Sequence, residues 1–203
     1  MNIPRLYAIV DASCFTSIGG LVEFARLLAE GGVRLIQYRN KCGATRRMLA
    51  DARELKRVVG GQAKLIMNDR ADLALAANFD GVHVGQDDLS VEAVRKVVGP
   101  GMIVGISTHN PEQIAAAHLL DVDYVAVGPV FATTSKENPD PVVGVDGVRR
   151  ARELTSKPLV AIGGITRANA RAVVDAGADS VAVISDLIEA PRESAQEFLK
   201  LLT

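Results

Sequence analysis

Residues 159–184 read LVAIGGITRANARAVVDAGADSVAVI and contain one complete copy of the pattern that decides the fold. An apolar run at 159–162 is followed by two glycines, a helix-like stretch at 168–176 and a second apolar run at 180–184. Both runs are continuously apolar, as is typical of parallel strands covered on both faces. This stretch therefore predicts a strand, a helix and a second strand parallel to the first.

The same pattern extends through the rest of the chain. Short runs rich in valine and isoleucine occur at 6–10, 33–38, 64–67, 81–84, 102–106, 124–127, 159–162 and 180–184. Stretches with helical spacing lie between them, at 21–30, 46–59, 111–120, 148–154 and 168–176. Eight strands alternating with helices predict a compact (β/α)8 TIM barrel, with residues 1–203 as one domain. A doubly wound open sheet is the main alternative, but no glycine-rich fingerprint follows the first run.

Charge and composition argue against several classes of protein. Lys and Arg number 23 against 24 for Asp and Glu, and a formal net charge of -1 does not favour nucleic-acid binding. No apolar run reaches the about 20 residues of a membrane helix, and the start does not resemble a secretory signal. Cys14 and Cys42 lack the spacing of a metal site. We expect a cytoplasmic protein with free thiols and without nucleic-acid or membrane partners; the sequence leaves the oligomeric state open.

Cationic side chains follow the second strand. In a barrel of this kind, chemistry gathers at the carboxyl ends of the strands. Gln37, Arg39 and Lys41 alternate along an extended segment, so they share one side of it. Inside a barrel their polar heads need an anion or several hydrogen bonds. With Lys136 after the sixth strand, they suit a multiply charged ligand such as diphosphate. Ion pairs with carboxylates at the rim are the less favoured alternative.

Two acidic residues follow the next two strands. Asp69 ends the third strand and Asp88 follows the fourth. Two carboxylates beside cations suggest Mg²⁺, which uses one or two protein carboxylates together with substrate phosphate oxygens. The alternative is that both residues cap helices.

A different anion site is predicted at the last two strands. Gly163 and Gly164 end the seventh strand, and Ile184 and Ser185 end the eighth. Barrels often hold a phosphate there on backbone N–H groups; an ordinary tight turn is the alternative. We find no nucleophile with a paired base, and His83 is as compatible with a hydrogen-bonded core as with catalysis. The whole pattern fits an enzyme that joins two phosphorylated small molecules and releases diphosphate.

Eight motifs in order carry a family resemblance: LYAIVD, QYRNK, NDRADLALA, DGVHVGQDDL, GISTHN, YVAVGPVFATTSK, VAIGGI and DSVAVIS. They span nearly the whole chain and resemble the signatures of the thiamine-phosphate synthase family. The resemblance implies a (β/α)8 barrel that joins hydroxymethylpyrimidine diphosphate to a thiazole phosphate, or to its carboxylated form. The products are thiamine phosphate and diphosphate, and the implied mechanism is dissociative and assisted by Mg²⁺.

The resemblance also implies roles for individual residues. The implied pyrimidine diphosphate site comprises Gln37, Tyr38, Arg39, Asn40, Lys41, Asn68, Ser107 and Lys136. The implied thiazole phosphate site comprises Thr133, Thr134, Ser135, Gly164, Ile184 and Ser185. Asp69 and Asp88 are the implied Mg²⁺ ligands, and the implied catalytic residues are Arg39, Lys41, Ser107 and Lys136.

Departures from the family pattern fall at two places. Tyr38 and Asn40 replace the commoner Leu and Glu, and alternation along the strand points both away from the cationic side chains. After Lys136 the family often has a proline at once, whereas here Glu137 and Asn138 precede Pro139. The segment 132–143, with Pro139 and Pro141, is expected to form a lid.

Two other functions are weighed against the synthase. A thiazole tautomerase of the same fold does not need the full set of cationic and acidic residues. A non-catalytic sensor of phosphorylated thiamine precursors is less favoured, because no part of the sequence is expected to form an output domain.

Overall fold

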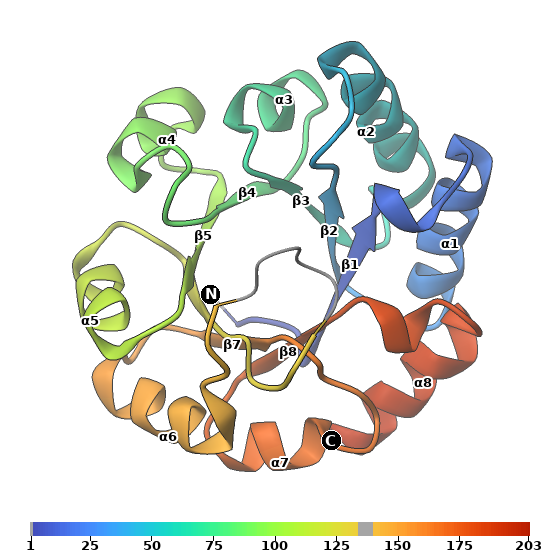
Figure 1. Ribbon diagram of the computed structural model, residues 1–203. Coiled ribbons are helices and arrows are strands. Elements are labelled where there is room, and N and C mark those ends of the chain that lie inside the picture. Colours follow the sequence, from blue (N-terminus) through green and yellow to red (C-terminus); the bar gives the residue numbers. More distant parts are fainter. Residues whose placement is uncertain (1, 134–139) are drawn as a thin grey trace.

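The computed structural model describes residues 2–133 and 140–203, and its centre is a closed barrel of eight parallel strands (Figure 1). The strands follow one another around the barrel in chain order, and β8 pairs with β1 to close it. They are β1 (Leu6–Asp11), β2 (Leu35–Arg39), β3 (Lys64–Asn68), β4 (Gly81–Val84), β5 (Ile103–Thr108), β6 (Tyr124–Val127), β7 (Leu159–Ile162) and β8 (Ser180–Val183). The predicted barrel and its eight strands are confirmed.

Helices surround the barrel on the outside (Figure 1). In the described part of the chain they are α1 (Ile18–Glu30), α2 (Thr45–Val59), α3 (Ala71–Ala76), α4 (Val91–Val98), α5 (Pro111–Leu119), α6 (Gly144–Leu154), α7 (Ala170–Asp175) and α8 (Pro191–Leu201), with short 3₁₀ turns η1 (Ala12–Cys14) and η2 (Ser185–Leu187). Sequence periodicity predicted five of the α-helices and missed α3, α4 and α8. The sequence around α3 and α4 lacks a clear periodic pattern, and the proline that opens α8 is the available start signal for that helix.

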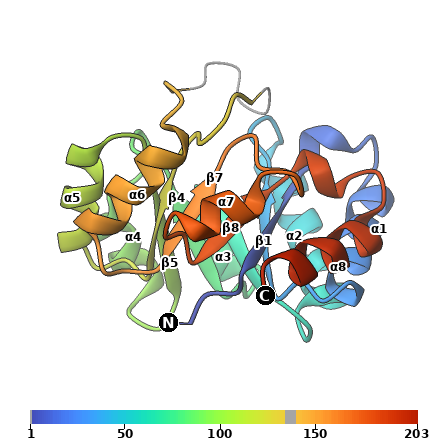
Figure 2. The ribbon, with the colours of Figure 1, turned by 90° about the horizontal axis from the view of Figure 1, so that it is seen from below.

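Two apolar layers stabilise this arrangement. The larger layer lies between strands and helices and includes Leu28, Leu55 and Phe198, which are fully buried. The smaller layer fills the interior of the barrel, where Ile3 packs with Tyr7 and other inward-facing residues. The N-terminal segment therefore closes the lower end of the barrel (Figure 2). The opposite end, where the strands finish, is left for the site.

Two further expectations concern the surface. Cys14 and Cys42 are exposed free thiols, as predicted. Among the described residues no helix combines the length and the apolar character that crossing a bilayer requires.

Candidate active site

A cavity of about 490 Å³ lies at the carboxyl ends of the strands, and all eight strands or the loops after them contribute to its lining. Most of the sequence-predicted site residues in the described part of the chain line this cavity. They are Gln37, Arg39, Lys41, Asn68, Asp69, Asp88, Ser107, Thr133, Gly164, Ile184 and Ser185. The fold thus brings together residues that lie up to 148 positions apart, because parallel strands all end at the same rim.

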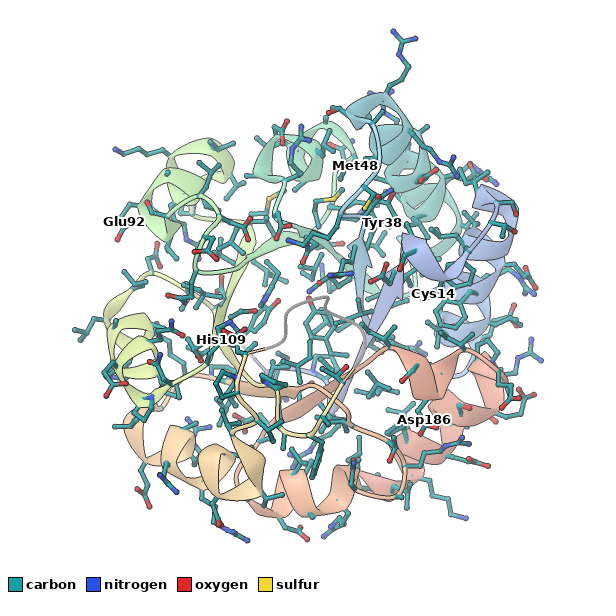
Figure 3. The ribbon with its side chains drawn as sticks, in the orientation of Figure 1. Cys14, Tyr38, Met48, Glu92, His109 and Asp186 are labelled. Atoms are coloured by element: carbon teal, nitrogen blue, oxygen red, sulfur yellow. The ribbon has the colours of Figure 1, made fainter. Side chains whose placement is uncertain are left out.

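Tyr38 and Asn40 are the exceptions. The Tyr38 side chain is buried in the outer core, beside Met48 and beneath α2 (Figure 3), and its hydroxyl donates to Asp51 at 2.9 Å. The Asn40 amide donates to the Tyr38 hydroxyl at 3.0 Å and accepts from the Gly43 N–H at 2.7 Å. The structure therefore does not bring these two predicted substrate-binding side chains to the cavity. They shape the turn that presents the neighbouring cations.

Both described cations of the rim are paired with carboxylates. Arg39 donates to Asp11 at the end of β1, and Lys41 Nζ lies 2.5 Å from Asp69 Oδ2. Asp11 is buried and also accepts from the N–H and hydroxyl groups of Ser13. The structure thus shows the ion pairs that the sequence suggests as the alternative to an anion site. An anionic ligand has to compete with these carboxylates for the two cations.

The two acidic residues behave differently from helix caps. Asp69 has a positive φ of 63°, and its N–H donates to the carbonyl of His83 at 2.7 Å. Asp88 accepts from the N–H of Gly85 at 2.7 Å. The residues that precede α3 and α4 are Arg70 and Ser90, so the capping alternative is wrong for both carboxylates.

The carboxyl groups of Asp69 and Asp88 lie close to each other. Burial raises the pKa of Asp69, the contact with Asp88 raises it further, and Lys41 opposes both effects. Two carboxylates in contact are stabilised by a shared cation, and their oxygen donors suit a hard ion such as Mg²⁺. Across the described ranges no third acidic, histidine or cysteine side chain completes a ligand cluster. The pair therefore fits an ion that takes its remaining ligands from water and substrate.

The opposite wall of the cavity is built from backbone. Gly163 and Gly164 have φ values of 101° and 63°, which a residue with a side chain adopts only with strain. A Cβ atom on Gly164 would lie 2.5 Å from the carbonyl oxygen of Ala132. The two glycines therefore do form a tight turn, which was the alternative to a phosphate site. The same turn leaves the backbone of Gly164 facing the cavity, next to Ser185 at the start of η2.

A network of side chains that the sequence did not predict forms the floor of the cavity. We call Gln37, Tyr7, Tyr124, His83 and Ser107 the floor network. Gln37 donates to the Tyr7 hydroxyl at 2.8 Å, and the Tyr7 and Tyr124 hydroxyl oxygens lie 3.0 Å apart. The two ring nitrogens of His83 lie 2.9 Å from Tyr124 Oη and 2.8 Å from Ser107 Oγ.

The floor network places a serine beside a histidine, a contact that the sequence spacing did not predict. His83 is buried, and this burial lowers its pKa to about 4. Inward positions of β1 and β6 were the available signal, because Tyr7 and Tyr124 alternate with outward-facing residues there.

Comparison with known proteins identifies the family. A family model described as thiamine monophosphate synthase matches residues 6–187. The chain belongs to this family. It is 63% identical to the thiamine-phosphate synthase of Koribacter versatilis, with 100% of this chain and 97% of that protein covered. It is 43% identical to the Chloroflexus aurantiacus thiamine-phosphate synthase, over 92% of this chain and 86% of that one.

A solved structure agrees with this membership in the thiamine monophosphate synthase family. The thiamine phosphate pyrophosphorylase from Pyrococcus furiosus superimposes with a TM-score of 0.86 at 33% identity, covering 98% of this chain and 95% of that chain. Of the residues that the family resemblance implied, Thr134, Ser135 and Lys136 lie outside the described residues, as does much of the candidate lid. Asn68 is 8% exposed and lines the cavity, and its Nδ2 has no partner among the described residues.

Proposed function

We propose that this enzyme condenses hydroxymethylpyrimidine diphosphate with a thiazole phosphate. The bond between the pyrimidine methylene carbon and the diphosphate oxygen breaks, and the electron pair leaves with the oxygen. The thiazole nitrogen then donates its lone pair to the methylene carbon, which gives thiamine phosphate and diphosphate. The observation that carries this proposal is the division of one cavity into a charged wall and a backbone wall, because two anionic substrates need two different anchors.

The charged wall would bind the diphosphate. Arg39 offers a planar fork that can contact two phosphate oxygens, and Lys41 offers a mobile point charge. Both are held near the cavity by carboxylates and would exchange these partners for the incoming anion. As the carbon–oxygen bond breaks, negative charge grows on the leaving group, and cations already in place stabilise it.

Asp69 and Asp88 would hold Mg²⁺ beside these cations. When bound, the ion would neutralise charge on the diphosphate. The two residues fit this role because their carboxylates lie in contact and supply only oxygen donors. Lys41 then changes from partner of Asp69 to partner of the substrate.

The floor and the backbone wall would orient the two ring systems. Asn68 and Ser107 offer buried polar groups to the pyrimidine ring, and the unpartnered Nδ2 of Asn68 is a donor ready for an acceptor on the ligand. Gly164 and Ser185 would hold the thiazole phosphate with backbone N–H groups. Holding both rings in line replaces a bimolecular encounter, which is a large share of the catalytic effect. No proton is lost in the bond-forming step, so no catalytic base is required.

The test is a product assay with purified protein. Both precursors are supplied with Mg²⁺, and thiamine phosphate and diphosphate are measured in parallel, since the proposed reaction forms them in equal amounts. Exhaustive chelation should abolish turnover, and added Mg²⁺ should restore it. Full activity in chelator would contradict the metal assignment. Isomerisation of the thiazole phosphate alone would identify a tautomerase, and binding without any product would identify a sensor.

A further inference from the structure

The floor network crosses the interior of the barrel, and Tyr7, Gln37, His83 and Ser107 line the cavity while Tyr124 lies behind them. Its members come from β1, β2, β4, β5 and β6, and four of the five are buried. Each link is a hydrogen bond of between 2.8 and 3.0 Å. The network therefore connects Ser107, its one half-buried member, through His83 to Tyr124, which does not line the cavity.

Counting hydrogens gives the direction of the network. The Gln37 amide donates to Tyr7, so the single hydroxyl hydrogen of Tyr7 is available for Tyr124. In that direction Tyr124 donates its own hydrogen to His83 Nδ1 and each hydroxyl hydrogen has an acceptor within the network, whereas the reverse direction gives the Tyr7 hydrogen none there. A neutral imidazole carries one hydrogen, which in this direction sits on Nε2 and donates to Ser107.

We infer that the floor network fixes His83 as the Nε2–H tautomer, so that Ser107 presents its hydroxyl hydrogen to the ligand. Ser107 acts in this arrangement as a donor to the substrate, and His83, Tyr124 and Tyr7 are positioning residues. His83 cannot take a proton from Ser107, because its Nε2 already carries one. The pair is therefore not a nucleophile with its base. The identity of the ligand atom that accepts this hydrogen bond rests on the proposed function.

The packing of the rings holds this direction in place. The rings of Tyr7 and Tyr124 meet edge to face at 5.9 Å, and the ring of Tyr124 stacks on His83 at 5.5 Å. Gly105 on β5 provides the space for this, since a Cβ atom there would lie 2.0 Å from Cζ of Tyr124. The rings are confined on several sides, so neither Tyr124 nor His83 can turn to another partner without repacking.

A second histidine provides an internal reference for the tautomer. His109 lies at the end of β5 and lines the cavity (Figure 3), and its Nδ1 is 2.6 Å from the carbonyl oxygen of Gly128. A carbonyl oxygen only accepts, so Nδ1 of His109 carries a hydrogen, and its Nε2 lies 3.5 Å from the carboxylate of Asp140. The two histidines are therefore expected to differ at Nδ1, which carries a hydrogen in His109 and none in His83.

The first experiment is ¹⁵N NMR of histidine-labelled protein at neutral to slightly alkaline pH. The chain has three histidines, and the signals lost in His83→Gln identify those of His83. We expect a protonated Nε2 and an unprotonated Nδ1 for His83, and a protonated Nδ1 for His109. A protonated Nδ1 on His83 would reverse the network, make Ser107 a donor to His83, and overturn the inference. This result does not depend on which reaction the enzyme catalyses.

The second experiment compares two substitutions at position 83. Gln carries an N–H donor at about the place of Nε2, whereas Met has a similar size and no donor. His83→Gln should keep kcat within about threefold, and His83→Met should lower it by roughly 10-fold to 100-fold, with a smaller change in KM. Equal losses in both variants would indicate a base and overturn the positioning role.

The matched control is His118→Gln, at a histidine on α5 that contacts Thr155 outside the cavity. It should leave both constants unchanged. If the wild-type protein forms no thiamine phosphate at all, the proposed function fails, and the tautomer measurement still decides the inference.

Discussion

The two walls of the cavity recognise anions by different physical means. The wall at β2, β3 and β4 consists of charged side chains, with Arg39 and Lys41 each paired with a carboxylate. The wall at β7 and β8 consists of glycines and the first residues of a 3₁₀ turn. Both face one cavity, and on the first wall a ligand must separate the ion pairs of Arg39 and Lys41.

This difference predicts which substitutions each wall should be sensitive to. Charged side chains are sensitive to the loss of a single charge and tolerate changes of shape, since long side chains adjust. A backbone site is sensitive to the addition of one carbon atom and tolerates the loss of a nearby side chain. Substitutions on the two walls should therefore affect different kinetic constants.

Asp69→Asn should have the largest effect. It removes one charge from the charged wall and keeps the fold, because Asn tolerates the positive φ of position 69 as well as Asp does. We expect kcat to fall on the order of 100-fold to 1,000-fold, with little change in the KM for the thiazole phosphate. Steady-state kinetics over a Mg²⁺ titration measure this.

Asp72→Asn is the control for that substitution. Asp72 lies in the first turn of α3 and pairs with Arg70, outside the cavity lining. Its removal should leave kcat unchanged. Wild-type kcat in Asp69→Asn itself would contradict the charged wall as the place where the leaving group departs.

Gly164→Ala should have the next largest effect, and it should change the KM for the thiazole phosphate instead of kcat. The added methyl group meets the carbonyl of Ala132 and forces a positive φ on alanine, a strain of about 2 kcal/mol. If the turn yields, the backbone moves away from the phosphate, and the KM for the thiazole phosphate rises roughly 30-fold.

The matched control is Gly61→Ala, where a Cβ atom meets nothing within 4 Å. Thermal unfolding of both variants separates strain from binding. An unchanged thiazole phosphate KM in a folded Gly164→Ala protein would remove the glycine turn from the binding site.

Lys41→Gln should have a smaller effect on the charged wall. The side chain is 48% exposed, so solvent screens its charge, and Asp69 remains as a ligand. We expect the KM for the pyrimidine diphosphate to rise roughly tenfold, and the rise to shrink in high salt. Lys64→Gln at the start of β3 removes an exposed lysine paired with Asp80 and should change neither kcat nor the KM for the pyrimidine diphosphate. An effect of equal size from both lysines would point to long-range charge alone.

The barrel and the two walls follow from the sequence for a simple physical reason. Eight continuous apolar runs separated by helices have few ways to bury both faces, and a closed parallel barrel is one of them. The rim residues then follow from their positions, since a residue at the end of a strand lies at the mouth. Alternation likewise predicted that Tyr38 and Asn40 face away from the cavity.

The partners of these residues do not follow from the sequence. The ion pair of Arg39 with Asp11 joins two strands, and the apolar pattern of the strands does not predict which carboxylate pairs with a given cation. The contacts of the floor network cannot be predicted either. Strand alternation places Tyr7 and Tyr124 inside the barrel, but they lie 117 positions apart and nothing in the pattern pairs them. Such contacts depend on the register between strands, which the closed barrel fixes only after folding.

Ser185→Ala should have the smallest effect, and it tests the backbone wall most directly. Ser185 is exposed, lines the cavity and begins η2, so its N–H and its hydroxyl are both near the presumed phosphate. Alanine keeps the N–H and the 3₁₀ turn and removes only the hydroxyl. If the backbone carries the binding, the KM for the thiazole phosphate should stay within about threefold, since a solvent-exposed hydroxyl contributes about 0.5 kcal/mol. A rise of tenfold or more would assign the phosphate to the side chain. Both walls would then bind their anions through side chains, and they would differ only in that one uses charged groups and the other a neutral hydroxyl.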